Sequence, residues 1–195
     1  MKIIIHGGFF SESSTNIETK IAKQQALLRI VKDSYAYLQN HSALETVVYA
    51  VSQLEDDELF NAGIGSQIQS DGKIRMSASL MDGESQKMSG VINIEEVKNP
   101  IQVAQVLMQV DDRILGGSGA TNFARKHGFE SFSTEIPQRR AEYEAKLASL
   151  GTGTVGCVAL DNNGKIAVAT STGGKGFEIP GRISDSATVA GNYAN

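Results

Sequence analysis

The sequence has few of the features that define several large classes of protein. Its 195 residues include one cysteine, no tryptophan and three prolines. The single Cys157 cannot form an internal disulfide, which favours a reducing compartment. No apolar run approaches the roughly 20 residues that cross a bilayer, and Met1 to Phe10 lacks the long apolar stretch of a signal peptide. We therefore expect a cytoplasmic protein without a membrane partner.

Positive charge and histidine are also scarce. The chain has 18 Lys and Arg against 22 Asp and Glu, a net charge of −4 and a pI near 5.4. Nucleic-acid binding depends on clustered cations, so no nucleic-acid partner is expected. The three histidines, His6, His41 and His127, lack helical metal-ligand spacing, which argues against a transition-metal site. With 41% hydrophobic residues the chain can build one globular domain over 1–195.

Periodicity predicts an α+β fold. The apolar residues Ile21, Leu28, Val31, Tyr35 and Leu38 recur at spacings of three, four and seven, which predicts a helix with an apolar stripe. The predicted strands cover residues 2–5, 73–81, 88–94, 155–160 and 165–171, and the predicted helices begin near residues 17, 42, 100 and 119. Residues 137–150 are interpreted as an exposed helix or a linker.

Two local signals fix the ends of elements. Ser42 is expected to cap a helix, with Glu45 as its capping-box partner. Asp161-Asn-Asn-Gly164 is typical of a β-hairpin turn. Because a two-stranded hairpin alone is marginal in water, either the earlier strands accept this one or its neighbours lie outside the chain.

Several motifs are better explained by structure than by chemistry. Gly151-Thr-Gly-Thr-Val-Gly156 fits the dinucleotide pattern but precedes a strand, where the pyrophosphate would find no helix N-terminus. Cys157 is interpreted as a buried core thiol. The run Glu55-Asp-Asp-Glu58 is interpreted as a solvated acidic turn.

The segment from Gly153 to Ser186 is dense in hydroxyl groups and glycines. Its Arg182 and Asp185 could bind the carboxylate and ammonium of an α-amino acid, while a hydroxyl attacks a side-chain carbonyl. Strand-forming threonines and an ordinary Pro180-Gly181 turn explain the same residues without any chemistry.

At these residues the sequence resembles the plant-type asparaginase/isoaspartyl peptidase family of N-terminal-nucleophile hydrolases. The motifs that carry the resemblance are His6-Gly-Gly8, Leu59-Phe-Asn-Ala-Gly-Ile-Gly65, Met81-Asp-Gly83, Asn99-Pro100, Gly153-Thr-Val-Gly156, Ala169-Thr-Ser-Thr-Gly-Gly174 and Gly181-Arg-Ile-Ser-Asp-Ser186. The resemblance implies an αββα sandwich made as a precursor that cuts itself between Gly153 and Thr154. Residues 1–153 would form the first subunit and 154–195 the start of the second.

The resemblance also implies roles for individual residues. Thr154 would be the nucleophile, and its new α-amino group, with a reference pKa of about 7.7–8.0, would act as its base without a histidine or a catalytic cofactor. Thr172 would hydrogen-bond to the nucleophile and tune it. The other implied site residues are Asn61 and Thr170 in the active site, and Arg182 and Asp185 for the substrate α-carboxylate and α-ammonium.

A sodium ion and an incomplete end follow from the same resemblance. The ion would be held by the main-chain carbonyls of Leu54, Glu55, Asp57, Phe60, Ala62 and Ile64, although a loop without an ion is an equal alternative. Only 42 residues follow the expected cut, since 195 − 153 = 42, so a missing C-terminal segment, a partner chain or pairing of subunits is expected. The predicted substrates are L-asparagine and β-aspartyl dipeptides; a catalytically silent homologue and a glycosylasparaginase-like enzyme are the alternatives.

Overall fold

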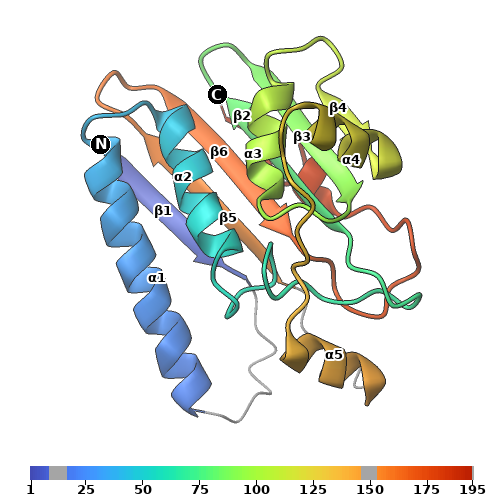
Figure 1. The fold of residues 1–195 in the computed structure, drawn as a ribbon. Helices are drawn as coiled ribbons and strands as arrows, with labels where there is room; N and C mark the ends of the chain where they lie inside the picture. The colour runs from blue at the N-terminus through green and yellow to red at the C-terminus, as the bar shows by residue number, and fades with distance from the viewer. Residues whose placement is uncertain (9–16, 146–152, 195) are drawn as a thin grey trace.

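The computed structural model describes residues 1–8, 17–145 and 153–194 and confirms the α+β class. Its strands form one six-stranded sheet in the order β1-β5-β6-β2-β3-β4 (Figure 1). The strands are β1 Lys2–Gly7, β2 Met76–Asp82, β3 Lys87–Ile94, β4 Ile114–Gly116, β5 Thr154–Leu160 and β6 Ile166–Thr172. The helices are α1 Ile17–Leu38, α2 Ala43–Glu55, α3 Pro100–Leu107, α4 Gly117–Lys126 and α5 Pro137–Glu144, with a short 3₁₀ turn η1 at Asp185–Ala187.

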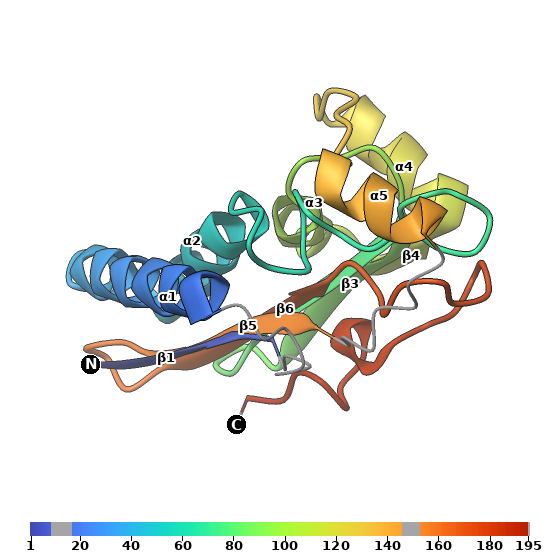
Figure 2. The same ribbon diagram turned by 90° about the horizontal axis from the view of Figure 1, so that it is seen from below.

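The two faces of the sheet are covered differently. The five helices lie on one face, and the C-terminal segment with η1 crosses the other (Figure 2). Alternate residues of β5, such as Val155 and Cys157, point into the core beneath the helices. On the opposite face Ile4 and Val158 are 71% and 44% exposed. The described residues form no second sheet, so the αββα sandwich stays a prediction.

The C-terminal hairpin of β5 and β6 pairs with strands that precede it in the chain, which was the first of the two alternatives. β5 pairs with β1 from Val155 to Leu160, and β6 pairs with β2. The turn between them is stabilised by Asp161, whose Oδ1 accepts hydrogen bonds from the Asn163 and Lys165 N–H groups at 2.8 and 3.0 Å. Except for the parallel pair β3 and β4, every pairing in the sheet is antiparallel.

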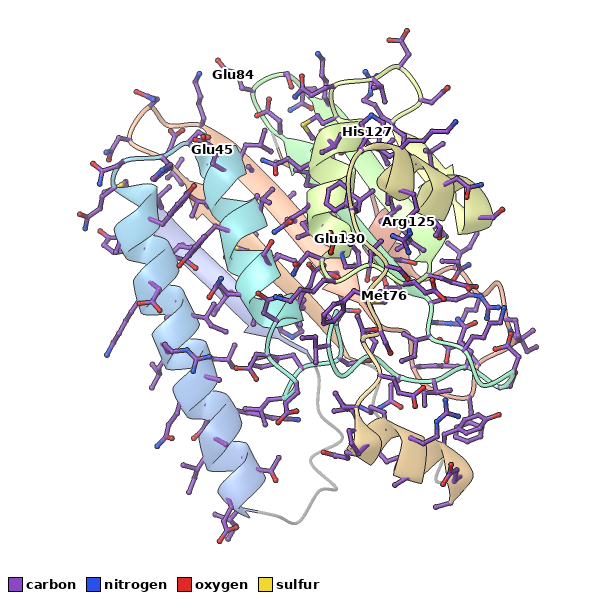
Figure 3. The ribbon with its side chains drawn as sticks, in the orientation of Figure 1. Glu45, Met76, Glu84, Arg125, His127 and Glu130 are labelled. Atoms are coloured by element: carbon purple, nitrogen blue, oxygen red, sulfur yellow. The ribbon has the colours of Figure 1, made fainter. Side chains whose placement is uncertain are left out.

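The capping box of α2 is confirmed. The Glu45 N–H donates to Ser42 Oγ at 3.2 Å, and the Ser42 N–H donates to Glu45 Oε2 at 2.9 Å. Figure 3 shows Glu45 at the start of the helix. These hydrogen bonds favour the charged carboxylate, so the pKa of Glu45 is lowered, first through the Ser42 N–H.

The predicted helix forms as α1, but of the five apolar residues in its predicted stripe only Leu38 is fully buried. Ile21, Leu28 and Tyr35 are 47%, 58% and 40% exposed. The residues of α1 that face the core follow a four-residue spacing, in which the small side chains Ala26 and Ser34 alternate with the large side chains Ile30 and Leu38. The core face of the helix therefore contains a serine and an alanine as well as large apolar residues, and apolar periodicity alone did not identify it.

Three smaller differences concern short or exposed segments. β4 has three residues and was not predicted. The charged stretch after Pro137 forms a helix as far as Glu144, and the rest of the predicted range, from residue 146, lies outside the described residues. In the described part of the chain, no helix combines the length and apolar character needed to cross a bilayer.

Candidate active site

The register of β5 and β6 brings two threonines together. Thr154, the first residue of β5, lies directly opposite Thr172, the last residue of β6. Both side chains point away from the helices, because residues at even positions of these strands share that face of the sheet. Strand pairing thus places two hydroxyl groups, 18 residues apart in sequence, at one end of the sheet on the side crossed by the C-terminal segment.

The Gly153 carbonyl oxygen receives two side-chain hydrogen bonds. Thr172 Oγ1 donates to it at 2.9 Å and Asn61 Nδ2 at 3.2 Å. Two donors on one carbonyl oxygen withdraw electron density from its carbon and stabilise negative charge that develops on the oxygen during attack. This carbonyl belongs to the bond between Gly153 and Thr154, so the polarised group and the expected nucleophile are adjacent.

Asn61 is held in place by the loop that carries Gly173 and Gly174. Its Oδ1 accepts from the Gln67 N–H at 3.0 Å, its Nδ2 also donates to the Gly174 carbonyl, and its own carbonyl accepts from the Gly173 N–H at 2.9 Å. A side chain at Gly173 would not fit, since a Cβ there would lie 2.6 Å from Asn61 Oδ1. The glycine pair therefore allows Asn61 to reach the cleavage site.

The Thr154 hydroxyl contacts a residue that the sequence did not single out. Its Oγ1 lies 3.2 Å from Ser186 Oγ. Thr170 supports the same serine, because its Oγ1 donates to the Ser186 carbonyl oxygen at 2.6 Å. Among the described residues, the hydrogen bonds of the His6 ring go to main-chain atoms, with Nδ1 2.8 Å from the Thr154 carbonyl oxygen. His6 therefore contacts the backbone of β5 and not the Thr154 hydroxyl.

Arg182 and Asp185 lie on the exposed C-terminal segment beside this site. Asp185 begins η1, immediately before Ser186, and Arg182 follows the turn closed by its N–H on the Ile179 carbonyl at 3.1 Å. Within the part of the chain that the structure describes, neither charged group forms a hydrogen bond or ion pair through its side chain. Their substrate-binding roles stay predictions.

The predicted solvated acidic turn forms over residues 56–58, but the first residue of the acidic run departs from the prediction. Glu55, the last residue of α2, is fully buried, and its Oε1 accepts from the Ile101 N–H at 3.1 Å. This contact caps the first turn of α3, where Asn99 makes no side-chain cap. Burial raises the pKa of Glu55 to about 8. The other acidic residues of the run are less buried.

The loop after Glu55, which carries the predicted sodium ligands, is tightly folded: Cβ atoms added at Gly63 and Gly65 would lie 2.2 Å from the Glu55 carbonyl oxygen and 2.7 Å from the Glu58 carbonyl oxygen. Two of the predicted ligand oxygens accept backbone hydrogen bonds, that of Glu55 from the Ile64 N–H at 2.7 Å and that of Asp57 from the Phe60 N–H at 3.1 Å. Among the described residues, the carbonyl oxygens of Phe60, Ala62 and Ile64 accept no hydrogen bond. Carbonyl oxygens suit a hard cation. No cluster of His, Cys, Asp or Glu side chains in 1–8, 17–145 or 153–194 is arranged to bind a metal.

Cys157 is the buried thiol that the strand pattern predicts. Its side chain lies in the core, and burial raises its pKa to about 12. We expect the folded protein at pH 8 to resist alkylation by iodoacetamide, because the thiolate is the reactive form. Intact-mass measurement should find one adduct only after denaturation, and complete labelling of the folded chain would contradict the burial.

A hydroxyl group beside a carbonyl oxygen that accepts two hydrogen bonds lies on a sheet covered by helices on one face. A family model described as asparaginase matches residues 1–148 and 133–195. The chain belongs to the asparaginase/isoaspartyl peptidase family.

Curated relatives match nearly the whole chain. An isoaspartyl peptidase/L-asparaginase of Nostoc is 45% identical over 99% of this chain and 67% of its own length, and one of Synechocystis is 46% identical over 99% and 64%. The isoaspartyl peptidase of Escherichia coli is 37% identical over 99% and 67%. The chain thus spans about two thirds of the length of these relatives.

Proposed function

We propose that this protein is a self-cleaving threonine amidohydrolase that hydrolyses the side-chain amide of L-asparagine, the β-aspartyl bond of isoaspartyl dipeptides, or both. One observation carries the proposal: the Gly153 carbonyl oxygen accepts from Thr172 and Asn61 while the Thr154 hydroxyl lies next in the chain. The names of the relatives, isoaspartyl peptidase and L-asparaginase, support the choice of substrates.

The proposed self-cleavage begins with attack of Thr154 Oγ1 on the Gly153 carbonyl carbon. The hydroxyl proton passes to the Thr154 nitrogen as the C–N bond breaks, which leaves an ester between the two residues. Water then hydrolyses the ester, giving a Gly153 carboxylate, a free Thr154 hydroxyl and a free α-amino group. With a reference pKa of about 7.7–8.0, this amine is partly neutral near pH 7.5 and can accept the hydroxyl proton in substrate hydrolysis.

In substrate turnover the same atoms would act on an external amide. Arg182 would hold the α-carboxylate through its guanidinium, and Asp185 would hold the α-ammonium. The Thr154 hydroxyl would attack the side-chain carbonyl, releasing ammonia or an amino acid and leaving an acyl ester that water hydrolyses. Both charged side chains are exposed and uncommitted in the described part of the chain, which supports this role.

A catalytically silent protein of the same family is the second candidate. It is favoured by the exposed apolar residues Ile4 and Val158 on the sheet face without helices. We propose that a second layer, from further residues or a partner chain, covers this face as in the αββα sandwich.

Intact mass under denaturing conditions, followed over days, tests the proposal most directly. We expect two species that sum to the parent mass plus one water, with a junction at Gly153–Thr154. Parallel assays on asparagine, a β-aspartyl dipeptide and a glycosylasparagine would define the substrate. A single unchanged mass with no turnover would favour the silent protein.

We further propose that the loop from Leu54 to Ile64 binds a sodium ion through its main-chain oxygens, with a structural role. A ligand that binds only the folded state raises its stability. The melting temperature should therefore rise by a few degrees when sodium chloride replaces choline chloride at equal ionic strength, and rise less with potassium chloride. Equal melting temperatures in all three salts would contradict an ion at this loop.

A further inference from the structure

Two different hydroxyl groups contact the two groups that react in the expected cleavage, the Gly153 carbonyl and the Thr154 hydroxyl. Thr172 Oγ1 donates to the carbonyl oxygen of Gly153, and its other contact is the Gly174 N–H, which donates to it at 3.2 Å. Ser186 Oγ lies 3.2 Å from Thr154 Oγ1. The carbonyl and the nucleophile are therefore contacted by separate side chains, and Ser186 is the hydroxyl that faces the nucleophile.

Ser186 lies in the C-terminal segment, and three hydrogen bonds hold its main chain in place. It is fully buried, and its carbonyl oxygen accepts from Ser79 Oγ at 2.6 Å, Thr170 Oγ1 at 2.6 Å and Asn192 Nδ2 at 3.1 Å. The three donors come from β2, from β6 and from the C-terminal segment. Their side chains are themselves buried, so the backbone of Ser186 is fixed from three directions.

We propose that Ser186 is a further catalytic residue, whose hydroxyl holds Thr154 Oγ1 in the rotamer needed for attack, and that Ser79, Thr170 and Asn192 are its positioning residues. The inference rests on the proposed function. A threonine side chain has staggered rotamers, and only one of them directs Oγ1 to a given carbon. A hydrogen bond with a fixed partner removes this freedom before the reaction begins.

The position of Ser186 also links the nucleophile to the expected substrate site. Ser186 directly follows Asp185 in η1, and the turn is closed by the Thr188 N–H on the Asp185 carbonyl at 2.9 Å. One rigid turn thus carries both the contact to Thr154 and the carboxylate expected to bind the substrate ammonium. Anchoring this turn sets the distance between the bound amino acid and the attacking oxygen.

Substitution of Ser186 by alanine tests the inference. We expect Ser186→Ala to slow self-cleavage by about tenfold to a hundredfold, the effect of a small misplacement of a reacting group, with partial recovery in Ser186→Cys. Ser89→Ala is the matched control, because Ser89 is equally buried and donates to the Ala104 carbonyl at 2.6 Å in a region remote from Thr154. It should lose similar stability and cleave at the parent rate.

A second measurement separates this inference from the proposed function. Three-bond couplings to the labelled Thr154 methyl group report its rotamer before any cleavage, and should indicate one rotamer in the parent and averaging in Ser186→Ala. Parental cleavage by Ser186→Ala would overturn the inference and leave the proposed function intact. If the parent chain never cleaves, the proposed function fails for this chain, and equal couplings in parent and variant would then overturn the inference as well. If Ser186→Ala does not fold, Ser79→Ala should show the same averaging to a smaller degree.

Discussion

Replacing Thr154 by alanine should abolish both self-cleavage and hydrolysis. The variant keeps the strand pairing of β5 and the hydrogen bonds to the Gly153 carbonyl, but it has no oxygen to attack that carbonyl. Removal of a nucleophile costs several orders of magnitude in rate. Denaturing mass spectrometry after long incubation should therefore find one intact species, and assays on asparagine and a β-aspartyl dipeptide should give no product.

Thr154→Ser is the matched variant for this experiment. Serine retains the hydroxyl and, after cleavage, the free α-amino group, so both reactions should continue at reduced rates. A Thr154→Ala protein that still divides at this bond, or still hydrolyses either substrate, would assign the nucleophile to another residue. The proposed mechanism would then be wrong even though the family membership stands.

Replacing Thr172 by valine should slow self-cleavage by about 10²–10³, the usual cost of losing one donor to a developing oxyanion. Valine has nearly the shape of threonine but cannot donate to the Gly153 carbonyl oxygen, which would then depend on Asn61 alone. The measurement is the time course of the two fragments by denaturing mass spectrometry, starting from freshly folded protein.

Thr46→Val controls for the loss of a buried hydrogen bond as such. Thr46 is fully buried in α2, and its Oγ1 donates to the Ser42 carbonyl at 2.8 Å, so the change in chemistry is the same. This variant should be less stable but cleave at the parent rate. If self-cleavage slowed equally in the two variants, the cleavage rate would depend on the stability of the fold. The proposal that Thr172 polarises the Gly153 carbonyl would then be wrong.

Local sequence signals predicted local structure well. The Ser42 and Glu45 pair and the Asp161–Gly164 turn depend on hydrogen bonds between residues a few positions apart, and both form as expected. The nearness of Thr154 and Thr172 also follows from a hairpin, because the turn sets the register of its two strands. The threonine pair was thus within reach of reasoning from a single sequence.

Long-range packing was beyond that reasoning. The burial of Glu55 depends on the start of α3, which lies 46 residues later at Ile101. The contact of Ser186 with Thr154 depends on donors from β2 and from Asn192, and one serine among many hydroxyl residues carries no distinctive spacing. The core face of α1 was also beyond the sequence, because apolar periodicity does not say which stripe of a helix packs on the sheet.

The strand order has a consequence for a protein cut at Gly153. β5 and β6 follow the cut but lie inside the sheet, between β1 on one side and β2 on the other, and both of these precede the cut. The two fragments would be interleaved, each completing the hydrogen bonding of the other, so neither could leave without opening the sheet along two seams. Cleavage would therefore create new chain ends at Gly153 and Thr154 without separating the two fragments. A native gel would show one species, whereas a denaturing gel would show two.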